Sequence, residues 1–117
     1  MDALSKKDRQ ALQRSIRFIE HFQVMMGPTV SASMIKAFLS VALEEGKPLS
    51  DYAAACGVNL STTSRHFMDL SDRSRSKGEG HMLIQRQRNP TNEREVLMSL
   101  SGQGKLMRRL VLETMGC

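Results

Sequence analysis

The sequence has few of the residues that mark secreted, metal-binding or membrane-embedded proteins. Its 117 residues include no tryptophan, one tyrosine, three prolines and only two cysteines, Cys56 and Cys117. Two cysteines do not form a disulfide framework, and we expect Cys56 to be a small core residue. No stretch approaches the ~20 apolar residues of a membrane span, and no apolar signal segment follows the charged N-terminus. We therefore expect a cytoplasmic, soluble protein without a membrane anchor.

The sequence also lacks the side-chain combinations that indicate an enzyme. The three histidines, His21, His66 and His81, are scattered, and no cysteine or aspartate pair accompanies them at metal-ligand spacing. No nucleophile and base pair is readable. Gly102 and Gly104 begin a predicted helix after a strand but lack the rest of a phosphate-loop pattern. These absences predict a protein that is not an enzyme and needs no metal or cofactor.

Positive charge is what the chain has in excess. The formal net charge is +5 and the sequence pI is about 9.7, which favours a polyanionic partner such as DNA, RNA or an acidic membrane surface. Apolar residues make up 40% and charged residues 25%, as in globular proteins. The length predicts a single domain over residues 1–117, with a core of Leu, Met, Ile, Val and Ala.

Residues 49–70, LSDYAAACGVNLSTTSRHFMDL, are typical of two short helices joined by a tight turn. Ser50 is predicted to cap the first helix, Gly57 to supply the left-handed turn, and Ser61 to cap the second helix. A small residue where the helices cross and a glycine four residues later favour a helix-turn-helix. A plain helical hairpin remains the alternative for these residues alone.

The second of these helices is predicted to have one inward and one outward face. Its inward stripe is expected to contain Leu60, Thr63, Phe67 and Leu70, which are three or four residues apart. Thr63 and His66 are polar where such motifs usually place apolar residues. The polar start of the helix, from Ser61 to Arg65, suits a DNA major groove.

Terminal helices are predicted over residues 5–26 and 102–115, capped by Ser5 and Ser101. The first has apolar residues along a stripe wider than one packing partner needs, which indicates either plain core packing or contact with a second subunit. In the last helix we expect four residues to face inward: Leu106, Met107, Leu110 and Val111. A further helix is expected from Ser31 to a C-terminal signal at Gly46, followed by a short extended link over residues 47–49.

A polar segment and a predicted hairpin follow the helix-turn-helix. Residues 71–80 contain no apolar side chain, which indicates either a solvated loop or a segment that contacts phosphates. Two alternating strands are then expected over residues 82–87 and 95–100, with a turn from Arg88 to Arg94. A basic hairpin after a helix-turn-helix is a wing, which can place a cation in a minor groove. The predicted fold class is mainly α with a small β-hairpin, a winged helix-turn-helix with flanking N- and C-terminal helices.

The wing carries a family resemblance. Residues 80–105, GHMLIQRQRNPTNEREVLMSLSGQGK, resemble the wing of the MarR (multiple antibiotic resistance regulator) family of transcription factors. Leu83-Ile84, Asn89-Pro90, Asn92-Glu93-Arg94 and Leu100-Ser101-Gly102-Gln103-Gly104 stand at the spacing of the family pattern. The similarity extends upstream through residues 49–70 and more loosely to Ser31. Asn92 stands where the family usually has aspartate, and Glu93 where it is usually basic.

The resemblance implies a DNA-binding transcriptional repressor that acts as a homodimer on a near-palindromic operator. The terminal helices are then candidate dimerisation elements, and a small-molecule effector is an open question. The resemblance places Arg94 at the wing tip and Arg65 where the family commonly contacts base or phosphate. We therefore expect the DNA-binding residues to be Ser61, Thr62, Ser64, Arg65, His66, Arg73, Arg75, Lys77, Arg86, Arg88, Asn92 and Arg94. Such a regulator would be bacterial or phage-encoded and associated with the nucleoid.

The alternative is a winged-helix module used in protein–protein assembly, or as a DNA-binding part of replication or packaging machinery. The acidic Glu93 and the short terminal helices favour this alternative. A redox role for Cys56 is a minor further hypothesis. The operator, the regulated genes and any effector cannot be read from the sequence.

Overall fold

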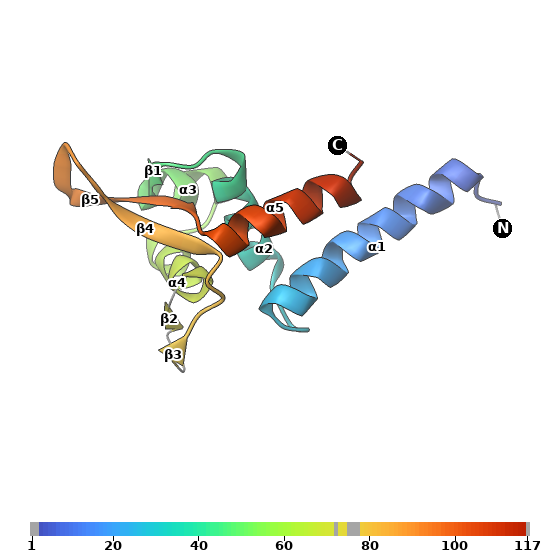
Figure 1. Cartoon of the computed structure of the whole chain (residues 1–117), viewed down its shortest axis with the longest axis horizontal. Helices are drawn as coiled ribbons and strands as arrows, with labels where there is room; N and C mark the ends of the chain where they lie inside the picture. The colour runs from blue at the N-terminus through green and yellow to red at the C-terminus, as the bar shows by residue number, and fades with distance from the viewer. Residues whose placement is uncertain (1–2, 72, 75–77, 117) are drawn as a thin grey trace.

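Five helices and five short strands follow one another along the chain in the computed structural model, which describes residues 3–71, 73–74 and 78–116 (Figure 1). The elements are α1 (Lys6–Met26), α2 (Ala32–Leu43), β1 (Lys47–Pro48), α3 (Leu49–Cys56), α4 (Leu60–Leu70), β2 (Arg73–Ser74), β3 (Gly78–Glu79), β4 (Ile84–Asn89), β5 (Asn92–Leu100) and α5 (Gly102–Thr114). This is a winged helix-turn-helix with flanking terminal helices, so the predicted fold class is confirmed.

The main sheet is antiparallel, with strand order β1-β5-β4. Ile84 pairs with Leu100 and Arg86 pairs with Met98, so the two long strands form the predicted hairpin. The predicted extended link is strand β1, whose Lys47 pairs with Met98 on the outer edge of β5. The backbone N–H of Gly46 also donates to the Met98 carbonyl at 2.7 Å. Because Pro48 has no N–H, β1 is a short edge strand.

Serine caps begin three of the helices as the sequence predicts. The Oγ atoms of Ser5, Ser31 and Ser101 accept hydrogen bonds from the third backbone N–H of α1, α2 and α5, respectively. The prediction that Ser50 caps α3 is wrong, because that helix begins one residue earlier, at Leu49, after Pro48. Pro48 is the N-cap residue, and this helix has no side-chain cap hydrogen bond.

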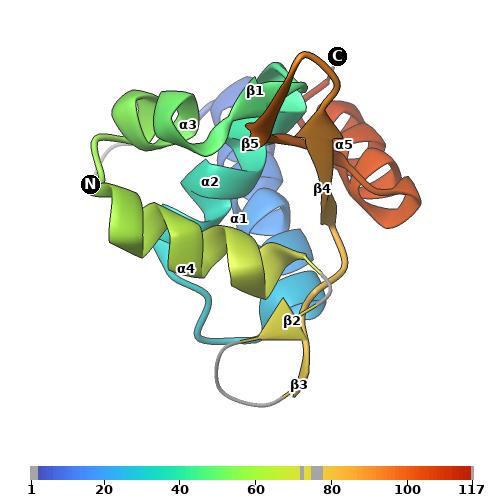
Figure 2. The ribbon, with the colours of Figure 1, turned by 90° about the vertical axis from the view of Figure 1, so that its left-hand side faces the viewer.

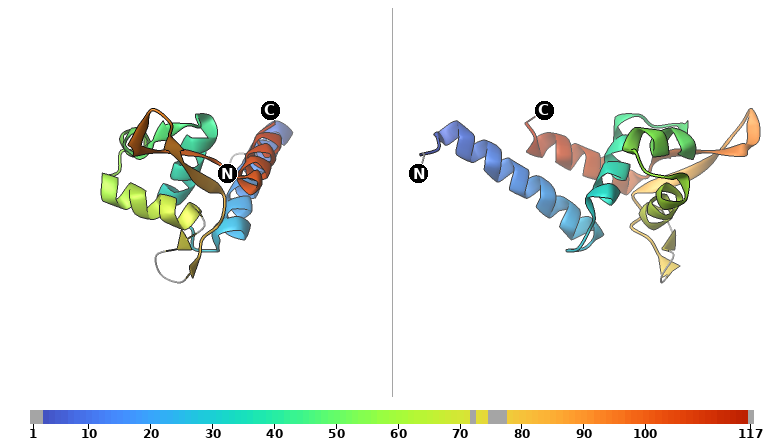
Figure 3. Two further views of the ribbon diagram at one scale, coloured as in Figure 1. Left: turned by 60° about the vertical axis from the view of Figure 1, so that its left-hand side comes forward. Right: turned by 180° about the vertical axis from the view of Figure 1, so that it is seen from behind.

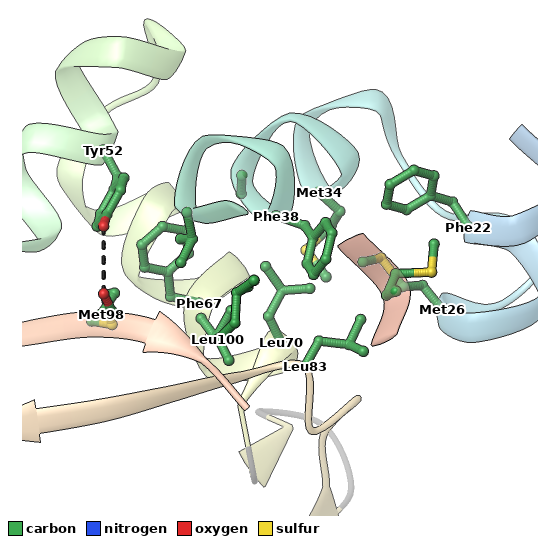
Figure 4. Close-up of a cluster of buried hydrophobic side chains, with 14 of the residues drawn as sticks. Phe22, Met26, Met34, Phe38, Tyr52, Phe67, Leu70, Leu83, Met98 and Leu100 are labelled. Carbon is green, nitrogen blue, oxygen red and sulfur yellow. Dashed lines mark hydrogen bonds between the residues drawn. The ribbon is translucent and has the colours of Figure 1, made fainter. Parts of the chain in front are cut away.

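The core lies where the five helices and the base of the hairpin meet (Figure 4). Aromatic rings join its layers in edge-to-face pairs, with Phe22 packed on Phe38 and Tyr52 on Phe67. The Cys56 side chain is buried, as predicted. Cys117 lies outside the described residues.

The segment after α4 differs from the predicted loop. Residues 73–74 and 78–79 form a small antiparallel pair, β2 with β3. Backbone N–H groups of His81, Met82 and Leu83 then donate to the carbonyls of Asp69, Ser71 and Leu70. These bonds satisfy carbonyls at the C-terminal end of α4, which a helix leaves unpaired. The two ends of the segment are therefore held together, and the wing begins beside the end of α4.

The alternation predicted for the first wing strand fails at its start. Met82 has φ of 58° and its side chain is half exposed, whereas Leu83 and Ile84 are both buried. The left-handed residue turns the chain, so two successive side chains enter the core. The strand itself is shorter at the start and longer at the tip than expected, because β4 runs from Ile84 to Asn89.

The terminal helices α1 and α5 project from the opposite end of the molecule to the wing (Figures 1 and 3). Together they give the protein its long dimension, with extents of 57 × 30 × 27 Å. His21 Nε2 and Thr114 Oγ1 join the two helices at 2.9 Å. Among the described residues, no helix is long and apolar enough to cross a bilayer.

Much of the apolar surface of α1 and α5 is uncovered in the single chain. Leu12, Ile16 and Ile19 of α1 are 54%, 60% and 44% exposed. In α5, Met107 and Val111 are buried as predicted, but Leu106 and Leu110 are 65% and 38% exposed. The prediction that Leu106 faces the chain's own core is therefore wrong, whereas Leu110 is mostly covered and lines a hollow together with Gln13 and Arg17 of α1.

Candidate nucleic-acid interface

The turn between α3 and α4 has the geometry of a helix-turn-helix (Figure 2). Gly57 is left-handed, with φ of 68° and ψ of 28°, which a glycine adopts without a steric penalty. The N–H of Val58 donates back to the Ala53 carbonyl at 3.2 Å and closes the end of α3. Ala53 is buried where α3 meets its neighbours. The turn thus sets the angle at which α4 leaves the body of the protein.

Helix α4 begins at an asparagine that the sequence analysis missed. The helix starts at Leu60 and its N-cap is Asn59, so the prediction that Ser61 is the cap is wrong. Asn59 Oδ1 accepts hydrogen bonds from the Thr62 N–H at 2.8 Å and from Ser61 Oγ at 3.1 Å. Asparagine is as good a cap as serine. The signal was present in the sequence, two residues before the serine.

Two opposite faces of α4 differ in character. Thr63, Phe67 and Leu70 are buried, as predicted, and Thr63 Oγ1 donates to the Asn59 carbonyl at 2.9 Å. This bond explains how a threonine replaces an apolar residue on the inner face. Leu60 does not join this stripe, since it is 53% exposed. It lies at the free end of the helix, beyond the reach of the core.

The outer face of α4 carries most of the residues predicted to read DNA. Ser61 and Arg65 are exposed, one helical turn apart, and Thr62 and Ser64 are partly exposed. His66 is partly buried, and its Nε2 atom is enclosed without a hydrogen-bond partner in the described part of the chain. The histidine ring is thus directed more toward the protein than its neighbours are.

The wing extends beyond the core and exposes basic side chains. Arg86 and Arg88 of β4 are exposed. They pair with Met98 and Val96 and lie on the same face of the hairpin as the buried Ile84, farther toward the tip. Gln85 and Gln87, which the sequence analysis did not single out, alternate with them on the other face and are also exposed. Of the predicted DNA-binding residues, Arg86 and Arg88 are therefore the wing cations whose side chains the structure describes.

The wing turn is tighter than predicted. Asn89 pairs with Asn92, and only two residues separate them. Asn89 Oδ1 accepts from the N–H and the hydroxyl of Thr91, and its amide donates to Glu95 at 2.8 Å. The register shifts between Arg88 and Asn89, so β5 bulges opposite the tip. The predicted seven-residue turn is instead a two-residue turn with a bulged return strand.

The structure describes the remaining predicted residues to different extents. Asn92 is exposed at the tip, at the start of β5. The backbones of Arg73 and Arg94 belong to β2 and β5, but their side chains lie outside the described residues. Arg75 and Lys77 lie wholly outside them.

A groove of about 640 Å³ runs along β4 from the end of α4. Its lining comes from the wing, from residues at the base of the wing and from Ser71, the C-cap of α4. Polar and basic side chains predominate along it, and its walls are formed by Ser71, Met82, Ile84, Gln85, Arg86, Gln87, Arg88, Val96 and Ser101. The groove offers two guanidinium groups to an anionic ligand.

The base of the wing is held by the single tyrosine. Tyr52 OH donates to the Glu44 carbonyl at 2.7 Å and accepts from the Lys47 N–H at 3.2 Å. It also lies 3.5 Å from the Met98 carbonyl oxygen (Figure 4). Burial raises the pKa of Tyr52, since the phenolate would lose its hydration. The pKa of Lys47 is raised by its hydrogen bond and charge interaction with Glu44.

No family model and no curated protein matches the sequence, whereas solved structures match the fold. The S. aureus MepR–DNA complex matches with a TM-score of 0.67 at 15% identity, covering 91% of this chain and 76% of that one. The Bacillus subtilis YusO protein matches at 0.65 and 17%, covering 89% and 66%. A mutant E. coli MarR complexed with operator DNA matches at 0.60 and 19%, covering 92% and 72%. The chain thus has the MarR-like winged helix fold, which confirms the wing resemblance at the level of fold.

Proposed function

We propose that this protein is a sequence-specific transcriptional regulator, a repressor, that binds double-stranded DNA as a homodimer. The observation that carries the proposal is the exposed polar face of α4, with Ser61 and Arg65, together with the exposed basic side chains of the wing. A major groove admits one α-helix, and the adjacent minor groove attracts cations. Two of the matched structures, MepR and MarR, are complexes with DNA.

In this proposal, side chains on the outer face of α4 contact the base edges. Ser61 donates its hydroxyl proton to Asn59 Oδ1, so its free lone pairs face outward as an acceptor. An acceptor selects the amino groups of adenine or cytosine in the major groove. Arg65 is suited to guanine, whose O6 and N7 accept two bonds from one guanidinium. Thr62 and Ser64 lie beside them, and His66 contributes at the margin.

In this proposal, side chains along the groove and near it contact the DNA sugar–phosphate backbone. One sugar–phosphate strand separates a major groove from the adjacent minor groove. A helix in one and a wing in the other would therefore bring that strand beside the wing, where Arg86 and Arg88 are exposed. Arg73, Arg75, Lys77, Asn92 and Arg94 remain proposed contacts. Phosphate contacts release counterions, so the affinity is expected to fall steeply with salt.

The homodimer is proposed from the uncovered apolar side chains of α1 and α5. Leu12, Ile16 and Ile19 lie on one side of α1, and Leu106 of α5 is also largely exposed. Clusters of this kind on a helix are buried by a partner in stable proteins. A two-fold dimer would read two half-sites roughly 10 bp apart. The site of action would be the nucleoid of a bacterial cytoplasm, or the genome of a phage.

The DNA proposal is tested by comparing two arginine variants on selected and random duplexes. Arg65→Ala is expected to cost about 1–3 kcal/mol on selected DNA and to relax the preference at one base pair. Arg86→Ala is expected to weaken both duplexes alike and to reduce the salt slope by about one. Fluorescence anisotropy at several salt concentrations measures both effects. Equal weakening of both duplexes by Arg65→Ala would refute base readout.

The dimer is tested by light scattering. The wild type is expected at twice the chain mass of 13.1 kDa, and Ile16→Glu at the mass of one chain, because a buried glutamate would be unpaired at the interface. Leu43→Glu is the matched control, since Leu43 is 88% exposed and belongs to α2 and not to the terminal helices. A monomeric wild type would refute the dimer. Absence of any DNA binding would instead favour the protein-assembly module.

A further inference from the structure

The direction of the wing is set only at its base. Ile84, Met98 and Leu100 anchor the hairpin in the core, whereas Arg86 and Arg88 lie beyond it and are exposed. Figure 1 shows the hairpin extending away from the helices. A small rotation at the base would therefore move the tip by a larger distance. Whatever holds the edge of β5 near Leu100 controls where the wing tip points.

Strand β1 and Tyr52 hold that edge at Met98, and one carboxylate holds it at Leu100. Glu45 Oε1 accepts a hydrogen bond from the Leu100 N–H at 2.7 Å. Strand β1 is only two residues long, and its pairing with β5 covers Leu97 and Met98. The Leu100 N–H lies past the end of that pairing. The Glu45 carboxylate therefore accepts the hydrogen bond that a backbone carbonyl of a longer β1 would have accepted. Glu45 thus extends the sheet edge by one hydrogen bond.

The other oxygen of the same carboxylate faces α5. Arg108 Nη1 lies 3.3 Å from Glu45 Oε2 and donates to the Ala42 carbonyl at 3.4 Å, near the end of α2. The Arg108 and Glu45 side chains are 35% and 31% exposed, so both are largely covered. A charge pair that is partly removed from water has a better-defined geometry than a fully exposed pair. Glu45 therefore connects the last residue of the wing to α5 and to the end of α2.

We propose that Glu45 is a positioning residue that fixes the direction of the wing relative to α5, with Arg108 as its partner. The inference rests on the proposed function, because the purpose of the link is to place the wing cations on DNA. Helix α5 is also a proposed dimerisation element. The same carboxylate therefore links the wing to a helix that is itself proposed to contact the partner subunit.

Three variants separate positioning from simple stabilisation. Glu45→Ala removes both links, whereas Glu45→Gln keeps an acceptor for the Leu100 N–H and removes the charge that faces Arg108. Glu44→Ala is the matched control, since the adjacent Glu44 pairs with Lys47 on the surface, with side-chain exposures of 62% and 42%. All measurements are made well below the melting temperature of each variant, so that only folded protein is compared.

The first measurement needs no DNA. Residual dipolar couplings of backbone amides report the orientation of β4 relative to α5. In the wild type and in Glu44→Ala, both elements are expected to fit one alignment tensor. In Glu45→Ala, the β4 amides are expected to depart from the tensor that still fits α2, α4 and α5. A single tensor for all elements in Glu45→Ala would overturn the positioning role, whether or not the protein binds DNA.

The second measurement is a footprint on selected DNA. Glu45→Ala is expected to lose minor-groove protection from hydroxyl radicals at the wing and to retain protection of guanine N7 under α4. Glu45→Gln is expected to give an intermediate wing footprint, and Glu44→Ala a normal one. Full wing protection in Glu45→Gln would overturn the role of the Arg108 link. A wild type without any footprint would refute the proposed function, and the dipolar couplings would still decide the role of Glu45.

Discussion

Removal of the Asn59 side chain tests the observed start of the recognition helix against the start that the sequence predicted. Asn59→Ala eliminates the acceptor of the Thr62 N–H and leaves Ser61 Oγ without its partner. The Thr63 bond to the Asn59 carbonyl remains, because it uses the backbone. The variant therefore loses one cap and keeps the inner face of α4 intact.

The expected loss of stability follows from the cap alone. Replacing an asparagine cap by alanine costs about 1 kcal/mol, within a range of roughly 0.5–2 kcal/mol. For a domain of this size, that corresponds to a fall in Tm of roughly 3–6 °C. Ser61→Ala is expected to change the free energy of unfolding by less than about 0.5 kcal/mol, since Ser61 is exposed and caps nothing.

Urea and thermal unfolding, followed by circular dichroism at 222 nm, measure both variants. Protein concentration is held equal, because dimerisation would shift the apparent stability. Asn59→Asp serves as a second comparison and is expected to retain stability, since aspartate also caps and its charge suits the helix N-terminus. If Ser61→Ala is as destabilising as Asn59→Ala, the assignment of the cap to Asn59 is wrong.

Two further predictions concern a close approach and a titration. Gly104→Ala is expected to lower the free energy of unfolding in urea by about 1–3 kcal/mol or more, because a Cβ there would overlap the Leu83 carbonyl oxygen. Gly102→Ala is the control and should be tolerated, since a Cβ at Gly102 meets open space. Equal stability of the two variants would contradict the packing at Gly104. The raised pKa of Tyr52 means that the folded state holds its phenolic proton at a pH where the unfolded chain loses it. Its contribution to stability should therefore be complete below about pH 10 and decline as pH rises further, and Tyr52→Phe should flatten this decline in unfolding measurements between pH 9 and 11.

Local chemistry made much of the fold predictable from the sequence. Gly57 ends α3 because glycine adopts the left-handed conformation without a steric penalty. Ser5, Ser31 and Ser101 cap helices by accepting from backbone N–H groups three residues further along the chain. The wing was predicted from alternating apolar residues and a turn signal. The outer face of α4 followed from helical periodicity, which placed Ser61 and Arg65 opposite Phe67 and Leu70. Each of these features depends on residues close together in the chain.

The errors near helix starts have a different origin. Asn59 and Ser61 are both suitable cap residues, so the sequence alone allows the helix to begin after either of them. In the structure the helix begins at Leu60 and Asn59 caps it. Leu60 lies on the same face as Thr63 and Phe67, but it is at the free end of the helix and remains exposed.

The order and type of the long elements, the basic character of the chain and the position of the wing all follow from local sequence patterns. Tertiary structure alone decided that Lys47 would pair with Met98, and that Glu45 would join Leu100 to Arg108, across 55 and 63 residues. It also decided that Leu106 would remain uncovered. Periodicity predicts on which face of a helix an apolar residue lies. Whether that face packs against the chain's own core depends on where distant elements lie. Contacts between residues far apart in the chain leave no local pattern from which they could be predicted.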